Sequence, residues 1–325
     1  MRIVPFGTSS GRPTAARNVS GLGLDVGASW ILVDCGEGTQ QQIMRSPLKI
    51  SRIDAVLLTH LHGDHVLGLP GLLGTMGMEG RTAPLTLIGP SGMWSWLEVM
   101  LALPILGLDF AVEVIELDGT TVGHPANLGT IAGLSVTALP LRHRVLSFGF
   151  RFAEPERPGR VDAERAAELG LAGPELGRLQ RGETVRGITP DQIIGPPRAG
   201  RVAAILGDTM YCETSVDLAR NADILVHECT YAAESHELCE QWMHSCTADA
   251  ARVAVEAGVR HLVVNHFSSR YLDAQRLVDE IRGIVPADMA VSEAVEGHPI
   301  DVERAISENC WASCIHRQPS RRRER

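Results

Sequence analysis

Lysine is almost absent from this 325-residue sequence, because Lys49 is the only one and arginine supplies the other basic side chains. The net charge is −9 at pH 7, which argues against a nucleic-acid partner, since phosphate binding needs positive charge. Phosphate binding depends on the local patch, however, and metal ions can add positive charge at a site. The overall charge therefore disfavours RNA binding without excluding it.

Long hydrophobic runs are also missing. The most apolar stretch, residues 93–110, is interrupted by Glu98 and Pro104 and is too short to span a bilayer, so we expect a core or interface helix. The first residues lack the layout of a signal peptide. The seven cysteines are scattered, which fits a reducing compartment better than a disulfide framework. We therefore expect a cytoplasmic protein with no membrane partner.

Short apolar runs that end in a polar, chemically capable residue recur along the chain. Each has the composition and length of a strand, and helical patterns such as residues 39–45 and 247–257 lie between them. This alternation predicts an α/β architecture. The expected strands are residues 30–34, 53–60, 134–143, 202–208, 222–228 and 261–266. Several end in Asp or His, at the sheet edge where ligands gather in open α/β sheets.

A His-x-His-x-Asp-His cluster at residues 60–65 follows one of these strands. Imidazole and carboxylate are zinc ligands, and two histidines separated by one residue can reach the same ion. The cluster supplies four ligands, and three residues at strand ends complete a set of seven for two ions. The expected ligands are His60, His62 and His143 on one ion, Asp64, His65 and His266 on the other, and Asp208 on both.

Asp208 is the natural bridge in this set, because a carboxylate can bind two cations and a neutral imidazole cannot. Two ions would lower the pKa of a water between them and clamp a phosphoryl group. The ligand types indicate Zn²⁺ and also admit Mn²⁺.

From about residue 154 to 200 the chain is rich in glycine and proline. This composition is typical of a long surface loop, and the alternative is an arm inserted between two core strands. A short helical stretch at residues 162–169 lies inside it. The basic residues 317–325 are expected to form a disordered tail, with an auxiliary RNA contact as the alternative.

Further motifs lie along most of the chain, at residues 6–18, 33–40, 59–73, 148–151, 195–197, 207–209, 227–230, 244–247 and 266–271. In this order they resemble the motifs of the ribonuclease Z family. The cluster at residues 60–65 alone marks only the metallo-β-lactamase superfamily. The tRNA-processing branch is marked by His227-Glu228, His244-Ser-x-Thr247, Ser269-Arg-Tyr271 and the Gly/Pro-rich insertion together.

The resemblance implies a metallo-β-lactamase fold, an αββα sandwich of two sheets flanked by helices. It implies a single domain over residues 1–325, with an inserted tRNA-binding arm at about 154–200. The implied activity is that of a zinc-dependent endoribonuclease with two ions per subunit. It would remove the 3′ trailer from precursor tRNA by a metal-activated water and leave a 3′-hydroxyl. A homodimer is also implied, in which the arm of one subunit holds the tRNA elbow while the other subunit cuts.

Three catalytic roles follow from the resemblance. Asp64 would help to activate the nucleophile, and His244, oriented by Glu228, would assist the leaving oxygen. A histidine paired with a carboxylate suits that role, because the pairing fixes its tautomer and supports its protonated form. The alternative is that Glu228 and His244 belong to a purely structural hydrogen-bonded network.

RNA contacts are expected at Arg17, Arg178, Arg181 and Arg270. Arg178 and Arg181 stand where the family often has lysine, which preserves phosphate contact but not lysine-specific geometry. No role is assigned to the thiols of Cys229 and Cys246, or to five further histidines, which are His124, His236, His261, His298 and His316.

Two other functions remain open. A hydrolase of the same fold that acts on a small ester or cyclic phosphate would keep the seven ligands but would not need a basic arm. A metal- or RNA-binding module without catalysis would not need a paired acid such as His244.

Overall fold

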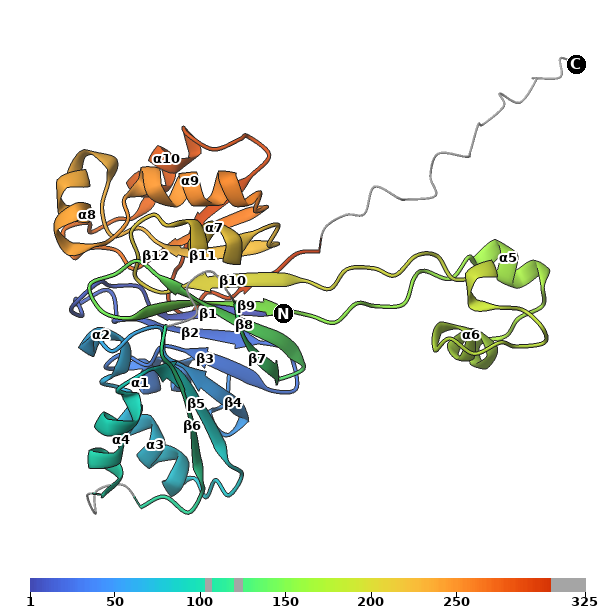
Figure 1. The fold of residues 1–325 in the computed structure, drawn as a ribbon, viewed down its shortest axis with the longest axis horizontal. Coiled ribbons are helices and arrows are strands. Elements are labelled where there is room, and N and C mark those ends of the chain that lie inside the picture. The colour runs from blue at the N-terminus through green and yellow to red at the C-terminus, as the bar shows by residue number, and fades with distance from the viewer. Residues whose placement is uncertain (103–106, 120–124, 305–325) are drawn as a thin grey trace, which may run out of the picture.

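The computed structural model describes residues 1–102, 107–119 and 125–304, so the tail expected at 317–325 lies outside the described residues. Within these ranges the chain forms two seven-stranded sheets that pack face to face, with helices on both outer faces (Figure 1). The predicted αββα sandwich is confirmed.

The first sheet is mixed. Its strands, in spatial order, are β14 (Ile300–Asp301), β1 (Arg2–Gly7), β2 (Gly21–Asp25), β3 (Trp30–Val33), β4 (Ile53–Leu57), β5 (Leu85–Pro90) and β6 (Val112–Leu117). Strands β14 to β3 pair antiparallel, and β3 to β6 pair parallel. Its outer face is covered by α1 (Thr39–Arg45), α3 (Leu69–Met78) and α4 (Met93–Ala102). The apolar stretch at 93–110 therefore contributes a core helix in its first half, and residues 103–106 lie outside the described ranges.

The second sheet repeats this plan. Its strands, in spatial order, are β13 (Ala290–Glu293), β12 (His261–Asn265), β11 (Ile224–Glu228), β10 (Val202–Leu206), β9 (Ser147–Ala153), β8 (Leu134–Leu141) and β7 (Ala126–Ile131). Strands β13 to β10 pair parallel, and β10 to β7 pair antiparallel. Its outer face is covered by α7 (Glu213–Ala219), α9 (Thr247–Ala257) and α10 (Gln275–Arg282).

The central strands are apolar at almost every position because both of their faces are buried. In β10, Ala203 and Ile205 face the core between the sheets, and Ala204 and Leu206 face the helices. This burial determines where each strand ends. The residues that follow the strand ends form the candidate site.

An arm projects from the body between β9 and β10 (Figure 1). Its stalk is a two-stranded ribbon in which Arg157 and Arg198 exchange backbone hydrogen bonds of 2.9 Å. At its base, Arg201 Nε donates to Glu154 Oε2 at 3.0 Å.

The head of the arm contains α5 (Ala163–Glu168) and α6 (Gly173–Gln180). Ala166, Leu179, Val185 and Ile193 form a small apolar core there, separate from the cores of the body. Sequence patterns predicted the first of these helices but not the second. No helix in the described parts of the chain is both long and apolar enough to cross a membrane.

Candidate metal centre and acid–base site

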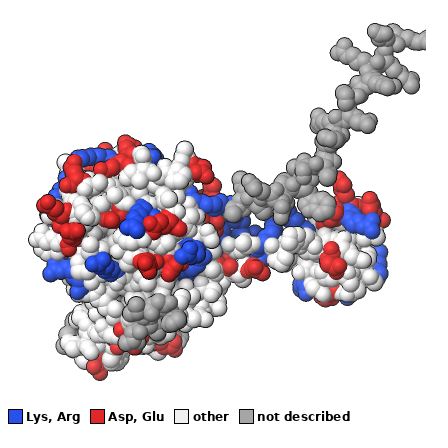
Figure 2. Space-filling view, turned by 45° about the horizontal axis from the view of Figure 1, so that its top comes forward, with Lys and Arg blue, Asp and Glu red and all other residues white. Residues whose placement is uncertain are grey.

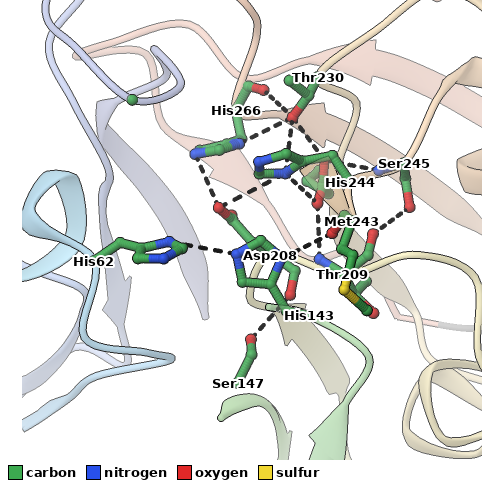
Figure 3. Close-up of polar contacts among 12 residues, drawn as sticks. His62, His143, Ser147, Asp208, Thr209, Thr230, Met243, His244, Ser245 and His266 are labelled. Atoms are coloured by element: carbon green, nitrogen blue, oxygen red, sulfur yellow. Dashed lines mark hydrogen bonds and ion pairs between the residues drawn. The ribbon is translucent and has the colours of Figure 1, made fainter. Parts of the chain in front are cut away.

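The seven expected ligands meet at one edge of the sandwich, from segments that follow four strands. The residues of the 60–65 cluster follow β4, and Asp64 and His65 lie in the short helix α2 (Gly63–Val66). His143 follows β8, Asp208 follows β10 and His266 follows β12. Figure 3 shows His62, His143, Asp208 and His266 pointing toward one another.

The first expected ligand group is compact. His62 Nδ1 lies 3.0 Å from His60 Nε2 and 3.3 Å from His143 Nε2. Asp208 Oδ2 lies 3.6 Å from His60 Nε2.

The second expected group has the same spacing. His266 Nε2 lies 3.3 Å from His65 Nε2 and 3.4 Å from Asp64 Oδ2. The same Asp208 oxygen that faces the first group lies 3.5 Å from His65 Nε2 and 3.3 Å from His266 Nε2. One carboxylate oxygen therefore adjoins both groups, as a bridging ligand would.

These separations fit metal ions. Two ligand atoms that are each about 2.05 Å from a tetrahedral zinc lie about 3.3 Å apart. Neighbouring donor atoms in both groups are separated by 3.0–3.6 Å. Imidazole and carboxylate are also the donors that a borderline cation prefers. The residues present therefore fit a divalent metal in each group.

The far ring nitrogens of several ligands are held by other residues. His65 Nδ1 lies 2.8 Å from Asp34 Oδ2, His143 Nδ1 lies 2.7 Å from the Met243 carbonyl, and His266 Nδ1 lies 3.1 Å from Thr230 Oγ1. Such contacts fix the tautomer and orientation of a metal-binding imidazole. Sequence analysis assigned no role to Asp34, Met243 or Thr230. Of these three residues, only Asp34 could have been recognised as part of the site, because it is a carboxylate at a predicted strand end.

Three of the residues at the site have left-handed backbone conformations. Asp34, Met243 and His266 have φ values of 61°, 57° and 58°. Non-glycine residues in this region cost free energy and occur where the surrounding structure imposes them, often at functional sites.

The charges of the expected ligands are set by their burial and by their neighbours. Burial, followed by the nearby histidines, lowers the pKa of His60 well below its usual value, so the ring is neutral. Burial opposes ionisation of Asp208, but His266, His65 and His60 together hold its pKa well below the usual range. Burial also opposes protonation of His65, yet Asp208 and Asp34 raise its pKa. Because a ligand must be deprotonated, metal binding at His65 would release a proton.

His244 and Glu228 form a pair beside the bridging carboxylate. His244 Nδ1 lies 2.9 Å from Glu228 Oε1. It also lies 3.8 Å from Asp208 Oδ2 (Figure 3). Glu228 also accepts hydrogen bonds from the Thr209 and Ser245 backbone amides at 2.7 and 3.1 Å, so its carboxylate is firmly placed.

This pairing determines the charge of His244. Burial alone would lower its pKa, but Glu228, through its charge and hydrogen bond, and then Asp208 raise it to about 9. The side chain is 14% exposed. A positively charged proton donor therefore lies next to the candidate metal centre and is reachable from solvent.

Comparison with known proteins identifies the family. A β-lactamase superfamily domain matches residues 29–160. The chain is 40% identical to the ribonuclease Z of Geobacillus kaustophilus over 307 residues, which cover 90% of this chain and 98% of that protein. The chain belongs to the ribonuclease Z family. It is also 41% identical to the ribonuclease BN of Erwinia tasmaniensis, over 88% of this chain and 96% of that protein.

A solved relative extends the match to the structure. Human tRNase Z, short form, superposes with a TM-score of 0.70 at 27% identity, covering 93% of this chain and all of that one (100%). The family and fold predicted from the ribonuclease Z motifs are thus confirmed. Clusters of His and Asp that could hold a divalent metal are present as well. The number and identity of the ions stay predictions.

The arginines predicted to contact RNA do not gather at one place. Arg17 donates to the Tyr271 carbonyl and lies over the Phe267 ring, 5.5 Å from its centroid. Arg270, on the loop after β12, lies over another ring, 5.2 Å from the centroid of Tyr231.

Arg178 and Arg181 lie in the head of the arm instead. Their Nε atoms donate to Glu183 at 2.7 and 3.3 Å. Whether any of these arginines binds RNA stays a prediction for this member of the ribonuclease Z family.

Proposed function

We propose that this chain is a zinc-dependent endoribonuclease that removes the 3′ trailer from precursor tRNA and leaves a 3′-hydroxyl on the tRNA. The observation that carries the proposal is the His244–Glu228 pair, 2.9 Å apart and beside Asp208, in a chain of the ribonuclease Z family. A hydrolase of this kind needs a bound nucleophile on one side of the phosphorus and a proton donor on the other.

Two zinc ions would supply a water of lowered pKa and two cationic contacts for the phosphoryl oxygens. His60, His62 and His143 would hold one ion, Asp64, His65 and His266 the other, and Asp208 both.

The protein groups would then move the protons. Asp64 is ionised, since burial is outweighed by His266 and His65, which lower its pKa, and it would accept a proton from the attacking water. As the water oxygen bonds to phosphorus, the bond to the tRNA 3′-oxygen breaks. His244 would give its proton to that oxygen, and Glu228 would stabilise the charged ring until then. The products are a tRNA with a 3′-hydroxyl and a trailer with a 5′-phosphate.

We propose that the arm binds tRNA for the other subunit of a homodimer. The metal ligand Asp208 follows the C-terminal end of β10, whereas the arm joins the N-terminal end of the same strand. The arm thus leaves the sheet opposite its own site, which favours use of its head by a partner's site.

The arm is close to neutral overall. Residues 154–200 contain seven arginines and eight carboxylates, and Figure 2 shows basic and acidic side chains interleaved on the head. Phosphate binding there would depend on local arginines such as Arg178 and Arg181, freed from Glu183.

We place the reaction in the cytoplasm, since the five cysteines in the described residues are free thiols.

The test is cleavage of a precursor tRNA that carries a labelled trailer, compared with a small activated phosphodiester. We expect cleavage at the tRNA 3′ end, a 3′-hydroxyl product, and loss of activity on chelation that added zinc restores. If the small diester is hydrolysed while precursor tRNA is neither bound nor cut, the small-substrate alternative replaces this proposal.

A further inference from the structure

A second cluster of metal-binding side chains lies where α8 (His236–Trp242) meets α9. His236 and Cys239 lie at the start of α8, and Cys246 and Asp249 lie at the start of α9. One ligand atom from each of the four lies within 4.8 Å of the other three. None of the four is among the seven residues of the candidate active site.

We propose that these four side chains bind a zinc ion, which holds the loop that carries His244. Each helix contributes a pair of ligands separated by two residues, which is the spacing common in structural zinc sites. The two thiolates provide the soft donors that zinc prefers over harder metals.

The distances suit such an ion. Around a tetrahedral zinc, a sulfur and a nitrogen or oxygen ligand lie about 3.5 Å apart. Cys246 Sγ lies 3.2 Å from Asp249 Oδ2 and 4.0 Å from His236 Nδ1. Both distances lie within about 0.5 Å of that value, and no two of the four ligand atoms are more than 4.8 Å apart.

The surroundings of His236 support its role as a ligand. Its other ring nitrogen, Nε2, lies 3.7 Å from Glu240 Oε1 on the next turn of α8. A carboxylate is one of the groups that accept a hydrogen bond from the far nitrogen of a metal-binding histidine, and Glu240 lies about 0.5 Å beyond that distance. His236 is half exposed and the two cysteines are buried, so an ion could enter from the surface and reach the thiolates.

Packing alone accounts for part of this cluster. Cys239 and Cys246 belong to a small apolar group with Tyr231, and Asp249 accepts the Cys246 backbone N–H at 3.0 Å as a helix cap. Neither role requires an exposed histidine beside the thiols. A metal site would account for the exposed histidine beside the buried thiols.

An ion here would tie both ends of the loop at residues 243–246. The His244 backbone N–H already donates to the Cys239 carbonyl at 3.0 Å, and the Met243 carbonyl accepts from His143. The four ligands are thus positioning residues for His244. This effect on cleavage rests on the function proposed above, whereas the metal site itself does not.

The test combines metal analysis with cobalt substitution of the full-length protein. We expect three zinc ions per chain, and two after Cys239→Ser/Cys246→Ser. With Co²⁺ in place of zinc, this site should give a thiolate-to-cobalt charge-transfer band, because the candidate active site has no sulfur ligand. The band should disappear in the double variant and persist in Asp208→Ala and in Cys212→Ser, a control thiol outside the cluster.

A milder, single substitution tests the metal site if the double variant does not fold. His236→Gln changes a half-exposed side chain, and His298→Gln makes the same change at an exposed histidine elsewhere. We expect His236→Gln, but not His298→Gln, to weaken binding of the third ion and to slow tRNA cleavage about ten-fold while two ions remain.

A wild-type protein that binds no more than two ions and gives no thiolate–cobalt band would overturn the proposal, as would a Cys239–Cys246 disulfide found by peptide mass spectrometry. A protein with three ions and the band, but without activity on precursor tRNA, would retain this site and lose the proposed function.

Discussion

Replacing Glu228 by Gln removes the charge that supports protonated His244 and keeps the size of the side chain. A free imidazole has a pKa of about 6.5, and in this protein the pKa of His244 is raised to about 9. The difference corresponds to about 3 kcal/mol in favour of the charged ring. Asp208, at 3.8 Å, remains after the change, so only part of this stabilisation is lost. We expect the pKa of His244 to fall by roughly 1–2 units.

The sign of the effect on rate follows from the role of the group. A proton donor works below its pKa, so cleavage declines as the pH rises through that value. Two bound cations would lower the pKa in both proteins, because positive charges oppose protonation of a nearby ring. The alkaline limb of the pH–rate profile should therefore move to lower pH by roughly 1–2 units in Glu228→Gln.

The assay is single-turnover cleavage of precursor tRNA across the pH range, with metal content and thermal stability measured for each protein. Glu256→Gln, the same change at a half-exposed position of α9, is the control and should leave the profile in place. In metal-free protein, NMR titration of His244 should show the same downward shift. An unchanged alkaline limb in a folded variant with full metal content would refute the assignment of Glu228 as the group that supports the acid.

Three further predictions concern separate parts of the protein. Asp208→Ala should abolish cleavage and lower metal content, because it removes the ligand expected to serve both ions; an active variant with full metal would disprove the bridge. His244→Ala should keep its metals and lose about 10²–10⁴-fold in rate, and a substrate with sulfur in place of the 3′-oxygen should recover most of that loss, since a thiolate leaves without a proton. Equal losses on both substrates would contradict the role of His244. Deleting residues 154–200 should leave hydrolysis of a small diester intact, because the head has its own core, but should weaken tRNA binding. Each lost phosphate contact should flatten the salt dependence by about 0.9 log units per log unit, and an unchanged slope would show that the arm does not bind tRNA.

The sequence predicted the parts of the site that depend on local patterns. Strand ends at residues 34, 60, 143, 208 and 266 were recognisable, because each of these residues lies within three positions of the end of a largely apolar strand. Helix α9 was predicted with its correct ends, because Asp249 caps its start and Gly258, with φ 64°, ends it.

The parts that were not predicted depend on distant contacts or on ambiguous residues. The contact between Asp34 and His65 requires β3 and β4 to pair in the observed register, which no local pattern specifies. Helix α6 was missed because Gly173 and Pro174 suggest a loop, whereas a proline is favourable in the first turn of a helix and Pro174 lies there.

The placement of the arm fixes the length of chain between the segment proposed to bind tRNA and the segment that carries the metal ligand Asp208. Strand β10 has five residues, so about 17 Å of extended chain separates the base of the stalk from the segment that carries Asp208. Because β10 is buried on both faces, this length cannot change without disturbing the core. The stalk is outside the core and its two strands pair with each other, so residues added to it in pairs would move the head outward and leave the metal ligands in place. A change in the length of the stalk would therefore change how far the head extends toward a longer or shorter substrate. The positions of the metal ligands would not change, because the sheet sets them.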